Sequence, residues 1–117
     1  SMIVALNLYP YNPGHLMVFP ARHCELPGEL DDAEAMAMHR LTVRSMGILG
    51  THFSPVGYNV GFNLGKCSGA SIPHMHQHIV PRYENETGFI DVMCGERIVV
   101  VDPMQVLGEL RAAFAGI

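Results

Sequence analysis

Alternation of apolar with polar or small residues predicts two strands at the start of the chain. The first covers residues 3–8 and the second residues 15–19, where Pro20 closes the run. Between them, residues 9–14 read Tyr-Pro-Tyr-Asn-Pro-Gly, which is a dense turn signal. We therefore expect the two strands to pair as an antiparallel hairpin with a longer loop.

A helical pattern follows the hairpin. Asp31, with Glu34 three positions later, has the form of an N-cap and its capping-box partner, which predicts a helix from here to about Gly47. Arg40 and Arg44, one turn apart, are expected on the solvated side of this helix. The residues expected on its apolar, core-facing side are Met36, Ala37, Leu41, Val43, Gly47 and Ile48.

The second half of the chain predicts three more strands, at residues 56–64, 74–80 and 98–101. Gly57 and Gly61 would permit a close backbone approach in the first of these, and Pro81 would end the second. Asp102 and Pro103 have the form of a helix start, so a closing helix is expected. This order of elements predicts an α+β fold: an antiparallel sheet of about five strands with two helices.

The chain has 117 residues, enough for one domain, which we expect to span residues 1–117. Its seven basic and eleven acidic residues give a net charge of −4, so it lacks the basic footprint of a nucleic-acid-binding protein. A local site for a small anion remains compatible with that charge.

Cysteine usage and the start of the chain bear on its surroundings. Cys24, Cys67 and Cys94 are odd in number and widely spaced, which favours free thiols in a reducing, cytoplasmic setting. The apolar start, residues 2–19, is interrupted by polar residues and prolines and has no basic leader, so we expect no signal peptide or membrane partner. Ser1 and Met2 resemble a cloning remnant, and we expect the natural protein to begin further upstream.

Three histidines, His74, His76 and His78, alternate along the strand predicted at 74–80, so their imidazoles would share one face. Two chemistries fit such a row. A neutral imidazole can attack phosphorus and later leave, which divides a nucleotidyl transfer into two easier steps. Alternatively, three imidazoles can hold a zinc ion that keeps an open coordination position.

The neighbouring residues favour phosphate over metal. No Asp or Glu lies between Glu34 and Glu84 to orient metal-bound imidazoles. Asn63 offers both a donor and an acceptor, Gly69 lets the backbone approach a phosphate, and the Ser71 hydroxyl could serve a leaving oxygen. We therefore predict phosphoryl chemistry and no metal site.

Residues 74–80, His-Met-His-Gln-His-Ile-Val, resemble the His-φ-His-φ-His-φ-φ signature (φ, apolar) of the histidine triad (HIT) superfamily of nucleotide hydrolases and transferases. Residues 7–18 are similar to the family's first conserved block, His23 falls where a further histidine is expected, and residues 63–71 match the segment before the triad. The resemblance implies a HIT-like fold that lacks the family's N-terminal strands. Gln77 replaces an apolar residue and should point away from the histidine face, affecting packing or a partner surface.

The resemblance also implies roles for individual residues. His76 would be the nucleophile that forms a nucleotidyl-imidazole intermediate, and His78 would contact the transferred phosphate. The backbone carbonyl of His74 would accept the other ring N–H of His76. The remaining implied positions are Ser71 at the leaving oxygen, Asn7 at the ribose, Leu8 at the base, Asn63 and Gly69 beside the phosphate, and His15 and His23 behind the triad.

The chain is most similar to the dinucleoside-polyphosphate branch of the superfamily, which contains fragile-histidine-triad-like hydrolases and diadenosine tetraphosphate phosphorylases. This implies a homodimer that cleaves a phosphoanhydride of a diadenosine polyphosphate. It implies no required cofactor, with magnesium accompanying the polyphosphate substrate at most. The alternatives are a nucleoside phosphoramidase, a nucleotide-binding module without catalysis and, less favoured, a zinc-dependent hydrolase.

Overall fold

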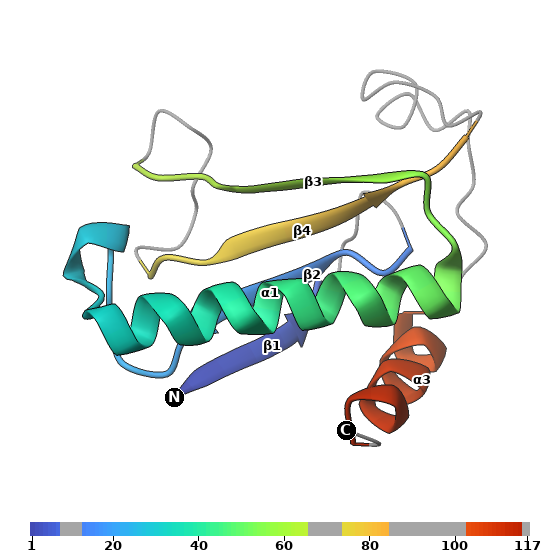
Figure 1. Ribbon diagram of the computed structural model, residues 1–117, viewed down its shortest axis with the longest axis horizontal. Coiled ribbons are helices and arrows are strands. Elements are labelled where there is room, and N and C mark those ends of the chain that lie inside the picture. Colours follow the sequence, from blue (N-terminus) through green and yellow to red (C-terminus); the bar gives the residue numbers. More distant parts are fainter. Residues whose placement is uncertain (8–12, 66–73, 85–102, 116–117) are drawn as a thin grey trace.

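The computed structural model describes residues 1–7, 13–65, 74–84 and 103–115. Its four strands form one antiparallel sheet in the order β1-β2-β4-β3. The strands are β1 (Met2–Leu6), β2 (Leu16–Pro20), β3 (Gly57–Phe62) and β4 (Gln77–Arg82). The 3-10 turn η1 (Pro27–Glu29) precedes helix α1 (Asp32–Phe53), and α3 (Pro103–Ala115) is the last helix (Figure 1).

This architecture confirms the predicted α+β fold, with α1 lying along one face of the antiparallel sheet (Figure 1). The described residues contain four strands, not about five. The strand predicted at 98–101 and the expected helix cap at Asp102 lie outside the described residues.

The predicted hairpin is present, with a five-residue register from Met2 opposite Pro20 to Leu6 opposite Leu16. Pro20 therefore belongs to β2 and does not merely close it. Gly14 is the last residue of the turn, with a φ of +83°, and a Cβ there would lie 2.9 Å from Cδ2 of Leu49. The position needs glycine because other residues rarely adopt this backbone conformation.

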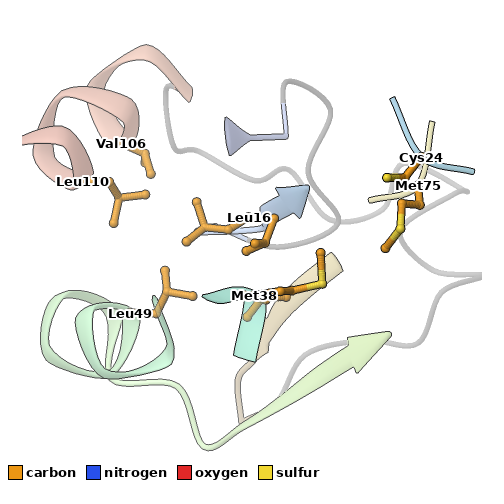
Figure 2. Packing of buried hydrophobic residues seen from close by; sticks show 9 residues of the cluster. Leu16, Cys24, Met38, Leu49, Met75, Val106 and Leu110 are labelled. Carbon is orange, nitrogen blue, oxygen red and sulfur yellow. The ribbon is translucent and has the colours of Figure 1, made fainter. Parts of the chain in front are cut away.

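The core lies between the helices and the sheet face that they cover. Along β2, buried and partly buried residues alternate, as expected for a strand with one covered face. Each large side chain buried here contributes on the order of 2 kcal/mol of stability. The buried apolar residues are Leu16, Val18, Cys24, Met38, Leu49, Met75, Ile79, Val106 and Leu110 (Figure 2).

The start of α1 is confirmed and its end is not. The Asp31 carboxylate accepts the Glu34 N–H at 2.7 Å, and Glu34 accepts the Asp31 N–H at 3.0 Å, which completes the capping box. The helix continues past Gly47 to Phe53, where Ser54 adopts a left-handed conformation with a φ of +49°. Each of its two glycines, Gly47 and Gly50, costs only about 1 kcal/mol in a helix, which packing of the rest of α1 offsets.

The predicted core-facing side of α1 is wrong in part, since Leu41 and Ile48 do pack against the core but two other positions do not. Met36 and Val43 are 50% and 56% exposed. The buried positions are Met38, Thr42, Ser45 and Leu49. The hydroxyls of Thr42 and Ser45 donate to carbonyl oxygens one turn earlier in the helix, so these polar residues can be buried. Arg40 and Arg44 are exposed, as expected.

Strand β4 begins and ends later than predicted. His74 and His76 precede it, and Pro81 lies inside it, paired with Tyr58 and buried. Because β2 pairs with β4 only as far as Ile79, no N–H donor toward β2 is needed at Pro81.

The two glycines of β3 have no close neighbour among the described residues. A Cβ added at Gly57 or Gly61 would meet no atom of the described residues within 4 Å. Among the described residues, none therefore makes the close approach that these glycines would permit.

Candidate active site

The three signature histidines occupy the segment that enters β4 and the second residue of that strand. The ring centroids of His76 and His78 are 4.8 Å apart, with an angle of 68° between the ring planes. The ring of His74 packs instead against Phe19, at 5.7 Å, and is stacked on His23, at 5.6 Å. His76 and His78 thus form a pair, while His74 contacts the segment that follows β2.

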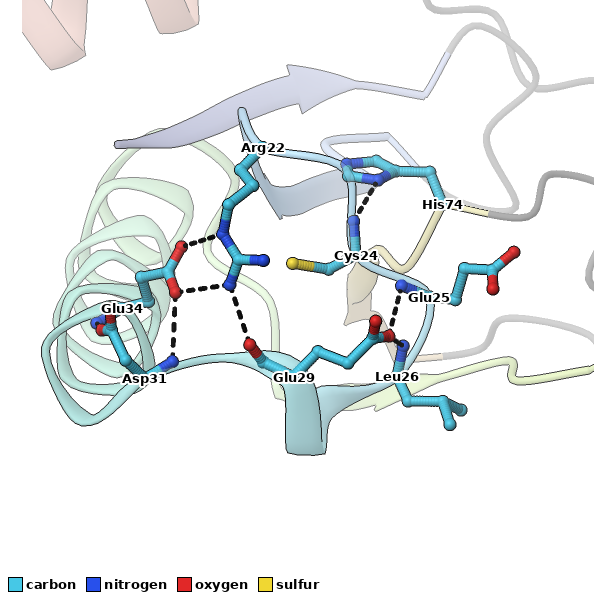
Figure 3. A network of polar contacts seen from close by, with 8 residues as sticks. All are labelled: Arg22, Cys24, Glu25, Leu26, Glu29, Asp31, Glu34 and His74. Atoms are coloured by element: carbon cyan, nitrogen blue, oxygen red, sulfur yellow. Dashed lines mark hydrogen bonds and ion pairs between the residues drawn. The ribbon is translucent and has the colours of Figure 1, made fainter.

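Backbone groups hold His74 on both ring nitrogens. Its Nδ1 accepts the N–H of Cys24 at 3.2 Å, and its Nε2 donates to the Pro20 carbonyl at 2.8 Å (Figure 3 shows the Cys24 bond). One nitrogen accepts and the other donates, so the imidazole is neutral with its proton on Nε2. The Met75 N–H also donates to the Cys24 carbonyl, at 2.7 Å. His74 therefore clamps the end of β2 to the segment before β4.

This clamp has no signature in the sequence, because Cys24 and Pro20 act through backbone atoms. The loop that carries Cys24 is fixed on its other side by Arg22 (Figure 3). The Arg22 guanidinium donates twice to the Glu34 carboxylate, at 2.7 and 3.2 Å, and once to the Glu29 carbonyl. The Arg22 contact is the main reason that the pKa of Glu34 falls to about 2.

His76 donates its Nδ1 proton to the carbonyl oxygen of His74 at 3.0 Å. A carbonyl can only accept, so the proton of neutral His76 is on Nδ1 and the lone pair is on Nε2. This is the hydrogen bond that the family resemblance implied. It leaves Nε2 as the ring nitrogen that can act as a nucleophile.

Besides His76, His78 contacts His15, a fully buried histidine that directly precedes β2. Nε2 of His15 lies 2.8 Å from Nδ1 of His78, and His15 is 0% exposed. Burial, with smaller effects of His78 and His76, lowers the pKa of His15 to about 4. Burial and then His76 lower the pKa of His78. Near neutral pH both rings are therefore uncharged and can bind an anion only through N–H groups.

Asn7 lies directly behind His15. Its Nδ2 is 3.3 Å from Nδ1 of His15, and its backbone N–H donates to the His15 carbonyl at 2.9 Å. The hairpin produces this contact because Asn7 directly follows Leu6 and His15 directly precedes Leu16, and Leu6 and Leu16 are the last β1–β2 pair. The structure thus joins Asn7, His15 and His78 in one hydrogen-bonded chain.

The other predicted site residues are distributed differently. His23 is exposed and contacts the site only through its stacking on His74 among the described interactions. Asn63 is exposed and follows Phe62, which is paired with Gln77, so it leaves β3 near the triad end of β4. Leu8, Gly69 and Ser71 lie outside the described residues.

Gln77 points away from the histidines, as predicted. Its Oε1 lies 2.6 Å from the hydroxyl of Thr42 on α1, on the covered face of the sheet. That hydroxyl also lies 2.8 Å from the Met38 carbonyl, so its single proton is shared between two acceptors. Gln77, the unusual polar residue of the signature, therefore connects β4 to α1 by a hydrogen bond.

The open face around His78 is flanked by small and apolar residues. His78 is opposite Met17 of β2 on one side and Gly61 of β3 on the other. Met17 is in turn opposite Ala5 of β1. Because paired residues of an antiparallel sheet point to the same face, Met17 and Ala5 form an apolar shelf beside the imidazole. On its other side, no described residue comes within 4 Å of a Cβ added at Gly61.

The described residues show no feature of a metal centre or of a membrane-spanning segment. They contain no group of three or more His, Cys, Asp or Glu side chains placed to hold a metal ion. None of the described helices is long and apolar enough to cross a membrane.

Comparison with known proteins gives one family match, to the HIT domain, over residues 1–85. The chain is 40% identical over 95 residues to AP-4-A phosphorylase of Mycobacterium tuberculosis, covering 80% of this chain and 49% of that protein. It is 29% identical over 91 residues to the asymmetrical bis(5'-nucleosyl)-tetraphosphatase of Schizosaccharomyces pombe, covering 78% of this chain and 50% of that protein. The chain thus spans about half the length of these relatives.

A solved structure supports the fold. A zinc-bound histidine triad family protein from Mycobacterium smegmatis superimposes with a TM-score of 0.78 at 24% identity, covering 98% of this chain and 78% of that one. At this identity the likeness concerns the fold alone.

Proposed function

The chain belongs to the HIT family, and on that premise we propose that it cleaves a phosphoanhydride of a dinucleoside polyphosphate, of the diadenosine class, through His76. The observation that carries the proposal is the hydrogen bond from Nδ1 of His76 to the His74 carbonyl. It leaves Nε2 with a lone pair, beside His78. The names of two relatives, a phosphorylase and a tetraphosphatase, support this substrate class.

In the proposed reaction, Nε2 of His76 attacks a phosphorus atom, forming a P–N bond while the bridging P–O bond breaks. The departing nucleotide leaves with the bridging oxygen, and the Nδ1 proton stays in its bond to the His74 carbonyl. Water or inorganic phosphate then attacks the same phosphorus atom and the P–N bond breaks, which restores His76 and releases a nucleoside monophosphate or diphosphate. The two outcomes share the first half-reaction.

The surrounding residues would bind the substrate. We assign a phosphate-binding N–H to His78, supported from behind by His15. The base would lie on the apolar shelf of Met17 and Ala5, which extends the sequence-based assignment of Leu8. The positions carried over from the family resemblance are Ser71 at the leaving oxygen, Asn63 and Gly69 beside the phosphate, and Asn7 at the ribose.

The test is to incubate the protein with diadenosine polyphosphates and nucleoside phosphoramidates, with and without inorganic phosphate, and to identify products by mass. His76→Asn should remove turnover while nucleotide binding survives, because the nucleophile is lost and the pocket keeps its shape. His52→Asn, which alters an exposed histidine at the end of α1, is the matched control. Near-normal turnover in His76→Asn would reject the mechanism.

Two alternatives give different results. A nucleotide-binding module would bind the panel without turnover and trap no labelled nucleotide on His76 after a rapid quench. A phosphoramidase would cleave only the phosphoramidates.

We propose that no cofactor is required and that magnesium only accompanies the polyphosphate. Both ring nitrogens of His74 are engaged by the backbone, which supports a triad that works without a metal. Protein treated with a chelator and then assayed on a phosphoramidate should keep its activity. Loss of activity together with stoichiometric zinc in the untreated protein would favour a zinc-dependent hydrolase instead.

We further propose a homodimer formed through the exposed side of α1 and the edge of β3 that pairs with none of the described strands. Met36 and Val43, two turns apart on α1, are 50% and 56% exposed, and Val60 of β3 is 43% exposed. A groove of about 350 Å³ lies between these two elements. Its lining residues are Pro27, Leu30, Ala35, Met38, His39, Thr42, Val60, Phe62 and Gln77.

A second copy suits this surface because β3 is paired on only one edge within the described sheet, and a second β3 could pair with the other. Val43→Glu should convert the dimer to a monomer in sedimentation experiments. The control is Met104→Glu, which alters a residue of α3 that is 64% exposed. A wild-type chain that sediments as a monomer would contradict the proposal.

We also propose a cytoplasmic location, supported by the free, buried thiol of Cys24. Recovery of the native protein from an oxidising compartment would contradict it.

A further inference from the structure

A hydrogen bond between two neutral imidazoles has a direction, because one ring donates an N–H and the other accepts it. Backbone carbonyls fix the direction for His74 and His76, since a carbonyl oxygen only accepts. In the contact between His15 and His78, Nε2 of His15 and Nδ1 of His78 face each other and not a carbonyl oxygen. Taken alone, Nε2 of His15 could donate to Nδ1 of His78, or the reverse.

The direction decides what His78 presents to a ligand. If Nδ1 of His78 accepts, the proton of the neutral ring is on Nε2, which can donate to a phosphate oxygen. If Nδ1 donates, Nε2 carries a lone pair, which repels that oxygen. The two rings are 5.0 Å apart between centroids and the inner one is fully buried, so bulk water does not reach His15 to exchange these states freely.

Asn7, which is hydrogen-bonded to the other ring nitrogen of His15, determines the direction. Nδ2 of Asn7 lies 3.3 Å from Nδ1 of His15, and an amide nitrogen only donates. Nδ1 of His15 therefore accepts, which places its proton on Nε2. That proton is donated to Nδ1 of His78, and the proton of His78 is then on Nε2.

We propose that Asn7 is a positioning residue that fixes the hydrogen-bond direction from Asn7 through His15 to His78, so that His78 presents an N–H to the transferred phosphate. The consequence for catalysis rests on the proposed function, whereas the direction itself is a property of the ligand-free protein. The lowered pKa values of His15 and His78 agree with both imidazole rings being uncharged. This role is separate from a contact between Asn7 and a ribose.

Nitrogen-15 NMR of the histidine rings in nucleotide-free protein tests the direction. Both His15 and His78 should carry the proton on Nε2. In Asn7→Ala, the His78 signals should move toward the average of the two tautomers, because the amide donor that favours one of them is lost. Asn59→Ala is the control: this amide, on β3, accepts from Arg82 at 2.7 Å and should leave the ring signals unchanged. A wild-type His78 protonated on Nδ1 overturns the proposal.

Kinetics separates this role from ribose binding. Asn7→Ala should lower kcat roughly two- to tenfold, the effect of losing one hydrogen bond, both on diadenosine tetraphosphate and on its 2',3'-dideoxy analogue. A residue that only contacts the ribose would show its effect on the first substrate alone, which would overturn the proposal. If no polyphosphate is cleaved by any form, the proposed function fails, while the NMR result still decides the direction.

A second variant covers the case in which Asn7→Ala does not fold. In Asn7→Asp the carboxylate accepts from Nδ1 of His15, so His78 can present an N–H only after the pair of rings takes up a further proton. The titratable groups that act on His15 are His78 and His76, and both remain in this variant. Its kcat should fall at alkaline pH and recover on acidification. A pH profile identical to that of the wild type would count against the proposal.

Discussion

The buried imidazole of His15 should make folding stability sensitive to acid. Its pKa is about 4 in the folded protein, against 6.5 for an ordinary histidine. Between these two values the unfolded chain binds a proton that the folded protein does not. Stability is therefore unaffected by this group above about pH 6.5 and falls progressively as the pH drops toward 4.

The size of the loss follows from the same two values. At 1.36 kcal/mol per pH unit, the difference between 6.5 and about 4 corresponds to roughly 3 kcal/mol of unfolding free energy. Small domains are stable by only about 5–15 kcal/mol, so one ring would remove a large part of the total. His78, whose pKa is also lowered, acts in the same direction.

The assay is urea unfolding at a series of pH values for the wild type and for His15→Gln. The glutamine amide keeps a donor near His78 and cannot titrate. The variant should be the less stable form near neutral pH, and its deficit should shrink by roughly 3 kcal/mol as the pH reaches 4, since carboxylate effects are common to both proteins. His39→Gln, at an exposed position of α1, shows whether the change is specific to His15. A deficit that stays constant with pH would refute the reasoning.

Three further predictions concern single positions. Gly61→Leu should fill the open space opposite His78 and raise KM at least severalfold with little change in unfolding free energy; unchanged kinetics would show that no ligand occupies that space. Gly14→Ala should lower the unfolding free energy by about 1–3 kcal/mol in urea titrations, because φ is +83°, and a wild-type midpoint would contradict this. In a double-mutant cycle, Thr42→Val should cost about 1–3 kcal/mol when Gln77 is present and less in Gln77→Leu, whereas additive effects would argue against the contact at 2.6 Å.

The sequence was sufficient wherever structure depends on near neighbours. The hairpin between residues 2 and 20 follows from a turn signal between two alternating runs. The start of α1 follows from Asp31 and Glu34, which are one turn apart. The bond from His76 to the carbonyl of His74 spans only two residues, and the family resemblance was enough to expect it.

The apolar residues alone predict the buried side of α1 only in part, since Leu41 and Ile48 pack against the core but the fully buried positions lie elsewhere. Thr42 and Ser45 are counted as polar, yet their hydroxyls are satisfied by carbonyls of their own helix, so burial costs little. Met36 and Val43 look like core residues and are exposed. Hydrophobicity is a property of one side chain, whereas the buried face of a helix also depends on how the helix packs on the neighbouring strands.

The sequence by itself determined the chemistry available: three imidazoles at alternate positions, with a polar residue between two of them. The tertiary structure decided how they differ. Pairing of β2 with β4 brings His15 to His78, which is 63 positions away, and backbone atoms of Pro20 and Cys24 occupy His74. Proton positions on the rings depend on these distant partners, because each imidazole nitrogen takes the role that its neighbour leaves to it.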